Sequence, residues 1–207
     1  MNPKLKSLYA NPIIGAFIAL LGACIFFATQ SDRFLSGQNF SLILQQVMVI
    51  GVIAIGQTLI ILTGGIDLSC GMAMALGSII MTKFATALGL NPAVAVLAGI
   101  LVCVLIGYVN GMLVTRVRLP AFIVTLGMLN IVFAITQLYS NGQTVTDIPQ
   151  SMLFLGTTFS IGGTNVAYGA VLMLALYLIT WIFLRDTSPG RHIYAVGNNP
   201  EAARLTG

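Results

Sequence analysis

Between Phe34 and Leu184 the chain carries only five charged residues, in a sequence that is otherwise mostly apolar. Charged residues make up 7% of the whole chain, against roughly 25% in a soluble domain. A water-soluble domain cannot leave so much surface uncharged, so the sequence predicts a polytopic membrane protein. The bilayer core has no water to bind backbone groups, so the spans must be helices or a closed barrel. Because the apolar runs are continuous and do not alternate, they predict an all-α fold.

Six apolar runs approach or exceed the ~20 residues that a helix needs to cross a bilayer. They predict one transmembrane domain over residues 1–184 and a cytoplasmic segment over residues 185–207. A glycine pair, an Asn-Pro step and charged residues separate most of the runs, and a long polar loop, residues 140–165, precedes the last. The six predicted spans are Pro12–Thr29, Leu42–Thr63, Leu68–Leu90, Pro92–Thr115, Pro120–Tyr139 and Val166–Leu184.

The basic residues near the span ends predict the orientation. Six spans place both termini on one side, and seven basic residues fall on that side against two on the other. The positive-inside rule then puts both termini in the cytoplasm and the 140–165 loop outside. The net charge of +4 therefore concerns orientation and gives no indication of nucleic-acid binding. The first set is Lys4, Lys6, Arg116, Arg118, Arg185, Arg191 and Arg204, and the second is Arg33 and Lys83.

Four of the amide side chains within the predicted spans form two pairs, each on one helix face, and an unpaired polar group is costly there. Gln46 and Gln57 are eleven residues apart and share a helix face, and Asn130 and Gln137, seven apart, do the same. Their amides either join helices or line a path for a polyhydroxylated solute, because an amide both donates and accepts hydrogen bonds.

Glycines on one face of the fourth predicted span, Gly99, Gly107 and Gly111, predict close packing against another helix.

The stretch Thr63–Gly71 is a predicted helix break that contains an acidic residue. Gly64 and Gly65 interrupt the helix, and Asp67 or Ser69 can cap the next one. Capping alone accounts for Asp67. An acidic residue near membrane depth is otherwise a functional candidate, and the break would then be a hinge for alternating access.

The closing stretch Asn199–Gly207 predicts one short helix with both ends specified. Asn199 suits the N-cap, Pro200 the first helical position and Gly207 the left-handed position after the helix. Glu201 and Arg204 complement the helix dipole. So short a helix is unstable alone, so this is either an ordinary juxtamembrane loop or a segment held by the membrane domain or a partner.

No enzyme site is indicated. The chain has no GxxxxGK[ST] loop for phosphate, and neither HExxH nor GxSxG. His192 is the only histidine, so a general base with partners is lacking. Cys24, Cys70 and Cys103 show no CxxC spacing, so neither a metal site nor a disulfide framework is indicated, and no cofactor is expected.

Four ordered blocks between Asn39 and Gly207 resemble the permease subunits of bacterial ribose-type monosaccharide ABC importers, the ribose, xylose, galactose and fructose systems. The overall pattern of the sequence, including Leu35–Gln46 and Gln143–Asp147, looks most similar to fructose-type members. The blocks are Gly56–Thr58 with Thr63–Ser69, Asn110–Thr115, Leu119–Gly127 and Gly190–Gly207.

The resemblance implies a fold of roughly ten helices in which a periplasmic binding protein delivers the sugar to two permease subunits. It also implies that two cytoplasmic ATPases drive transport and that each binds a helix that follows the sixth span. The implied coupling residues are Gly190, Arg191, Asn199, Pro200, Glu201, Ala202, Ala203, Arg204 and Gly207.

Two function classes remain open. One is a permease of the bacterial inner membrane, and the other is a stand-alone channel or secondary carrier that needs no ATPase. Family members are longer and carry more spans, so we expect that these 207 residues alone transport nothing.

Overall fold

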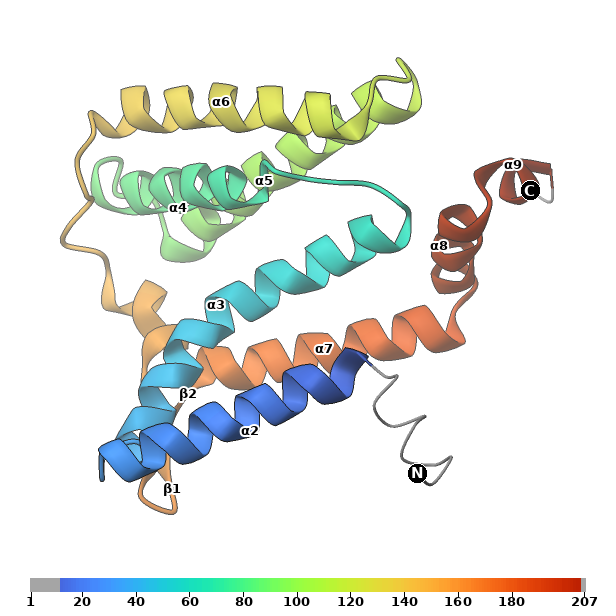
Figure 1. Cartoon of the computed structure of the whole chain (residues 1–207). Helices are drawn as coiled ribbons and strands as arrows, with labels where there is room; N and C mark the ends of the chain where they lie inside the picture. Colours follow the sequence, from blue (N-terminus) through green and yellow to red (C-terminus); the bar gives the residue numbers. More distant parts are fainter. Residues whose placement is uncertain (1–11, 206–207) are drawn as a thin grey trace, which may run out of the picture.

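The computed structural model describes residues 12–205, and the side chains from residue 14 onward. Most of this part is helical (Figure 1). The elements are α2 (Pro12–Gln30), α3 (Gly37–Leu62), α4 (Cys70–Thr86), α5 (Pro92–Thr115), α6 (Ala121–Ser140), η1 (Gln150–Gly156), β1 (Thr158–Ile161), β2 (Thr164–Ala167), α7 (Tyr168–Asp186), α8 (Ser188–Asn198) and α9 (Pro200–Leu205). The all-α fold class is confirmed.

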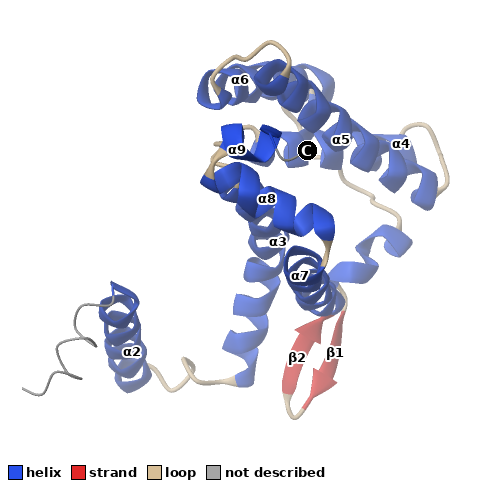
Figure 2. Ribbon diagram, turned by 90° about the vertical axis from the view of Figure 1, so that its right-hand side faces the viewer, coloured by secondary structure: helices blue, strands red, loops and turns tan. Residues whose placement is uncertain are grey.

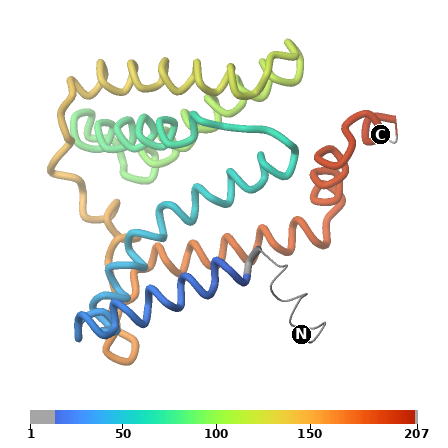
Figure 3. The backbone as a smooth tube through the Cα atoms, viewed as in Figure 1, coloured from blue at the N-terminus to red at the C-terminus, as the bar shows by residue number. Residues whose placement is uncertain are grey.

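The helices form two groups. In one group α4 packs against α5 and α6, and in the other α3 packs against α7 and β2. Helices α3 and α4, although consecutive, touch little. Figures 1 and 3 show the two groups one above the other, and α2 stands apart from both in Figure 2. The chain passes between the groups at residues 63–69 and again at residues 141–157.

Each predicted apolar run is helical over most of its length. The predicted span Pro92–Thr115 coincides with α5, and the other five differ from their helices in at least one bound. Among the described helices, α3, α5, α6 and α7 are long and apolar enough to cross a membrane. Helix α4 is apolar but shorter, and α2 is apolar over Ile14–Gln30, the part whose side chains are described.

Helix α3 begins five residues before its predicted start because Ser36 caps it: its hydroxyl accepts from the Asn39 N–H at 3.3 Å. Helix α4 ends before its predicted Leu90, in a turn where Gly89 has φ +63°.

The core of the α4–α6 group consists of Ala73, Leu76, Ile106 and Val132. Glycine allows the closest approach in this group. A Cβ at Gly99 would lie 2.6 Å from the Gly77 carbonyl oxygen, so neither position accepts a side chain without movement. Among the described residues, no atom of a neighbouring element lies within 4 Å of a Cβ placed at Gly107 or Gly111, so the predicted packing face is confirmed at Gly99 only.

The predicted loop 140–165 contains the short helix η1 and a two-stranded antiparallel hairpin. Two turns in this loop use left-handed backbone: Asn141 has φ 55° beside Gly142, and Gly162 and Gly163, both with positive φ, join β1 to β2. The register pairs Thr158 with Ala167.

Candidate functional site

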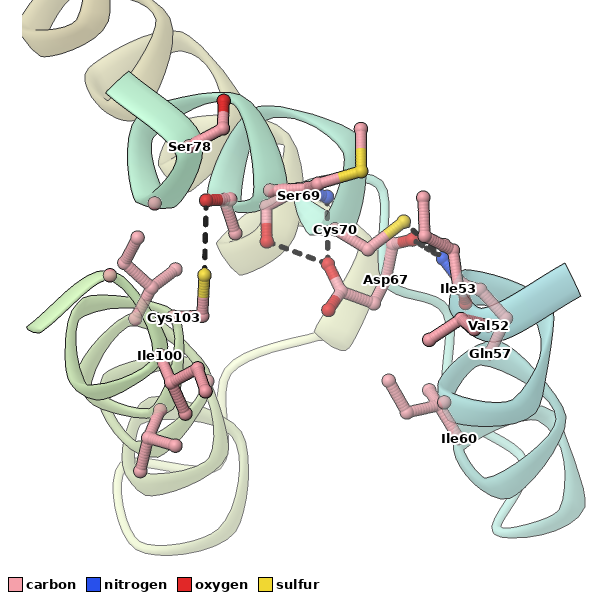
Figure 4. A pocket seen from close by; sticks show the side chains of 18 of the residues that line it. Val52, Ile53, Gln57, Ile60, Asp67, Ser69, Cys70, Ser78, Ile100 and Cys103 are labelled. Carbon is pink, nitrogen blue, oxygen red and sulfur yellow. Dashed lines mark hydrogen bonds between the residues drawn. The ribbon is translucent and has the colours of Figure 1, made fainter. Parts of the chain in front are cut away.

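A cavity of about 490 Å³ lies where α3 faces α4 and α5 (Figure 4). Most of its wall is apolar or glycine. The polar side chains on the wall belong to Gln57, Asp67, Ser69 and Ser78, together with the thiols of Cys70 and Cys103. An apolar wall with a few clustered polar groups is the usual character of a small-molecule site.

The predicted helix break forms the polar corner of this cavity. Helix α3 ends at Leu62, and Gly64 adopts φ +78°, a conformation that glycine tolerates at no steric cost. Helix α4 begins at Cys70, two residues later than predicted. The backbone between them is therefore irregular where it meets the cavity.

Asp67 organises this irregular segment through its own neighbours. Its Oδ1 accepts from the N–H and from the hydroxyl of Ser69, both at 2.7 Å. Ser69 is the N-cap residue of α4, but its side chain makes no cap hydrogen bond. Of the two predicted capping residues, Asp67 therefore orders the helix start and the Ser69 hydroxyl does not cap the helix.

Gln57 reaches the break from α3. Its Nε2 donates to the Asp67 carbonyl at 2.6 Å and to the Cys70 sulfur at 2.8 Å. Figure 4 shows this amide pointing toward the break. One side chain thus joins α3 to the first residue of α4.

The α4–α6 group holds the break from the other side. Asn110 in α5 donates from Nδ2 to the Ser69 hydroxyl oxygen at 2.9 Å, and both residues are buried. Thr125 in α6 donates to the Ile66 carbonyl at 3.2 Å. The Oδ1 of Asn110 is buried and has no hydrogen-bond partner within the described part of the chain. Four helices therefore contribute to one polar cluster.

The predicted path and hinge residues fall in two places. Gln57 and Asp67 line the cavity, and Gly64 and Gly65 form the break beside it. Gln46, Asn130 and Gln137 are exposed away from the cavity. The structure does not bring these three to the site, and the Asn130 amide instead donates to the Leu126 carbonyl at 2.8 Å.

Three further residues of the site were not predicted to line a path: Cys70, Asn110 and Thr125. The sequence pattern identifies Cys70 only as a cysteine without CxxC spacing, and Asn110 only as part of a sequence block. An amide within an otherwise apolar run is the signal that could have identified Asn110, since such a group needs a partner inside the bundle.

The C-terminal segment forms two helices, α8 and α9, so the prediction of a single helix in this segment is incomplete. The predicted start of the last helix is confirmed: the Asn199 carbonyl Oδ1 accepts from the Ala202 N–H at 3.0 Å and Pro200 opens α9. Glu201 lies in its first turn and Arg204 in its last. Gly207 lies outside the described residues.

Residues 39–207 match the family described as branched-chain amino acid transport system / permease component. The chain is 44% identical to the fructose import permease protein FrcC of Rhizobium meliloti, over 97% of this chain and 57% of the relative. It is 37% identical to the ribose import permease protein RbsC of Escherichia coli K12, over 93% of this chain and 60% of the relative.

The chain thus spans less than two thirds of the length of these relatives. No solved structure matches it significantly. The family match covers most of the chain and includes the break, the cavity and the C-terminal segment. The chain therefore belongs to the permease component family of branched-chain amino acid transport systems.

Proposed function

We propose that this chain is the membrane-spanning part of an ABC importer for a monosaccharide, with fructose as the first candidate. The observation that carries the proposal is its 44% identity to a fructose import permease over 97% of this chain. Ribose import permeases match over nearly as much of the chain. The chemistry of the cavity is compatible with a sugar, because amide, hydroxyl and carboxylate groups can bond its hydroxyls.

In the proposed arrangement the six apolar helices cross the inner membrane and both termini face the cytoplasm. The α5–α6 loop, which carries Arg116 and Arg118, lies at the same end of the bundle as α8 and α9 (Figure 1). Aromatic and basic residues, which are typical of membrane interfaces, lie near both ends of the helices and support the positions of the two membrane surfaces. Lys83 lies 4.8 Å from the centre of the Tyr139 ring, and Arg185 lies 4.9 Å from the centre of the Trp181 ring near the other end.

The partners in this proposal are a second permease copy, a periplasmic sugar-binding protein and cytoplasmic ATPases. The docking surface for the ATPase is the segment α8–α9. Glu201 and Arg204 are both exposed on α9, as a docking surface requires. The reaction is translocation without bond chemistry in this chain, and the ATPase supplies the energy.

Uptake of labelled sugar tests the proposal in proteoliposomes that hold a permease of the relatives' length containing this sequence, together with its ATPase and its binding protein. We expect uptake that requires ATP and the binding protein, with fructose preferred to ribose. We also expect Glu201→Arg to abolish ATP-driven uptake without loss of membrane insertion. Uptake down a gradient without ATP would instead identify a channel or a secondary carrier.

Thiol labelling tests the orientation separately. Arg191→Cys should react with an impermeant reagent only after the cells are opened, and Arg33→Cys should react in intact cells. The unsubstituted chain, with its three cysteines, gives the background. Labelling of Arg191→Cys from outside intact cells would overturn the topology and the docking role together.

A further inference from the structure

Helix α8 is fixed to the end of α7 by a tight corner at Thr187. The Thr187 hydroxyl donates to the Phe183 carbonyl at 2.6 Å and accepts from the Gly190 N–H at 3.1 Å. Gly190 is buried, and a Cβ there would overlap backbone atoms of Phe183 and Leu184. The corner therefore leaves no space in which α8 can shift freely against α7.

The C-terminal end of α8 lies in close backbone contact with the C-terminal end of α3. A Cβ at Gly197 would overlap the Leu62 carbonyl oxygen, and it would lie 3.0 Å from the Leu62 carbonyl carbon and 3.5 Å from the Thr63 Cα. These are backbone atoms, which cannot rotate away as a flexible side chain can. Figure 2 shows α8 crossing beside α3 and α7. Only glycine fits at this contact.

Leu62 is the last residue of α3, and the helix break begins at the next residue. Asp67, five residues after Leu62, lines the cavity, and its backbone carbonyl accepts a hydrogen bond from the Gln57 amide. Beyond it, α4 is packed firmly on α5 and α6, whereas α3 touches α4 little. A displacement of the α3 end is therefore taken up in residues 63–69, the polar corner of the cavity.

We propose that Gly197 is a positioning residue that transmits movement of the segment α8–α9 to the cavity through Leu62 and the helix break. This inference rests on the proposed function, because it requires an ATPase that moves the segment. The movement passes from α8 to α3 through their backbone contact, and α3 then moves relative to the α4–α6 group. Coupling through α7 alone would not need a glycine at position 197.

The first test compares Gly197→Ala with Gly127→Ala in the assembled importer. Gly127 lies in α6, and no atom of a neighbouring element lies within 4 Å of its Cβ position, so it controls for glycine replacement. We expect Gly197→Ala to retain the ATPase on purification and to hydrolyse ATP, while sugar moved per ATP falls by roughly tenfold or more, within the usual range of coupling between sites. Gly127→Ala should keep the wild-type ratio, and an unchanged ratio in Gly197→Ala would overturn the inference.

The second test does not depend on the folding of that variant. Spin labels at Ile61→Cys and Val196→Cys report the distance between α3 and α8 at the contact, and labels at Ile61→Cys and Leu101→Cys report the distance between α3 and α5. All three positions are exposed. With ATP turnover we expect the first distance to stay constant and the second to change. A first distance that changes as much as the second would overturn the inference.

The two proposals fail differently in these experiments. If the unsubstituted importer shows no ATP-driven uptake, the proposed function fails. If it transports and Gly197→Ala transports with the same ATP ratio, only the coupling route fails.

Discussion

The amide Nε2 of Gln57 lies 2.8 Å from the sulfur of Cys70, and this bond links α3 to the first residue of α4. The two helices otherwise touch little. The same nitrogen donates to the Asp67 carbonyl at 2.6 Å. One side chain therefore holds together two helix groups at the place where the cavity meets irregular backbone, so its loss should affect the site more than the fold.

Gln57→Leu should lower ATP-driven uptake roughly five- to tenfold, because it removes two hydrogen bonds that each contribute about 0.5–1.5 kcal/mol. Gln46→Leu is the matched control: it lies on the same helix, it is exposed, and it does not line the cavity. Initial rates of sugar uptake in proteoliposomes provide the measurement. Equal rates for the two variants would show that the bridge has no part in transport.

Ser69→Ala should destabilise the α4–α6 group by about 1–3 kcal/mol, because the buried Asn110 amide then loses its acceptor. Adding Asn110→Leu should recover part of this loss, since it removes both the orphaned donor and the unpaired Oδ1. Thermal unfolding in detergent of the two single variants and the double variant gives the interaction between the sites. Strictly additive losses would contradict the proposed pairing.

Gly99→Ala should destabilise the packing of α4 on α5 by about 1–3 kcal/mol, because its Cβ would lie 2.6 Å from the Gly77 carbonyl oxygen. Gly111→Ala, on the same helix with no neighbouring element within 4 Å, should be neutral or stabilising by up to about 1 kcal/mol. The two variants are compared by their unfolding temperatures in the same detergent. A larger loss for Gly111→Ala would mean that another chain packs there.

Hydropathy and charge could predict the helices, because long apolar runs without charge have few alternatives in a membrane. The ends of the helices differ from the predicted ends because hydrogen bonds of single side chains determine where a helix begins. Ser36 starts α3 earlier than hydropathy predicts, and the Asp67 carboxylate delays the start of α4. Such local competition is invisible to a window average over about 20 residues.

The site was less predictable than the fold because it depends on which helices meet. Amides at equal spacing have different surroundings: Gln57 reaches the break, whereas Gln46 on the same helix is exposed. Asn110 meets Ser69 across 41 residues of sequence. The pairing required the crossing of α4 and α5 at Gly77 and Gly99, and the predicted glycine face included only one of these glycines.

Asn199→Ala should weaken binding of the ATPase, because it removes the hydrogen bond that caps α9, a helix of six residues. Loss of an N-cap costs about 1 kcal/mol on average, and so short a helix has little stability to spare. Asn198→Ala is the matched control, since Asn198 is the last residue of α8 and does not cap α9. Copurification of the ATPase with each variant, with membrane insertion checked separately, should show reduced recovery for Asn199→Ala alone. Equal recovery with both variants would mean that the order of α9 does not contribute to docking.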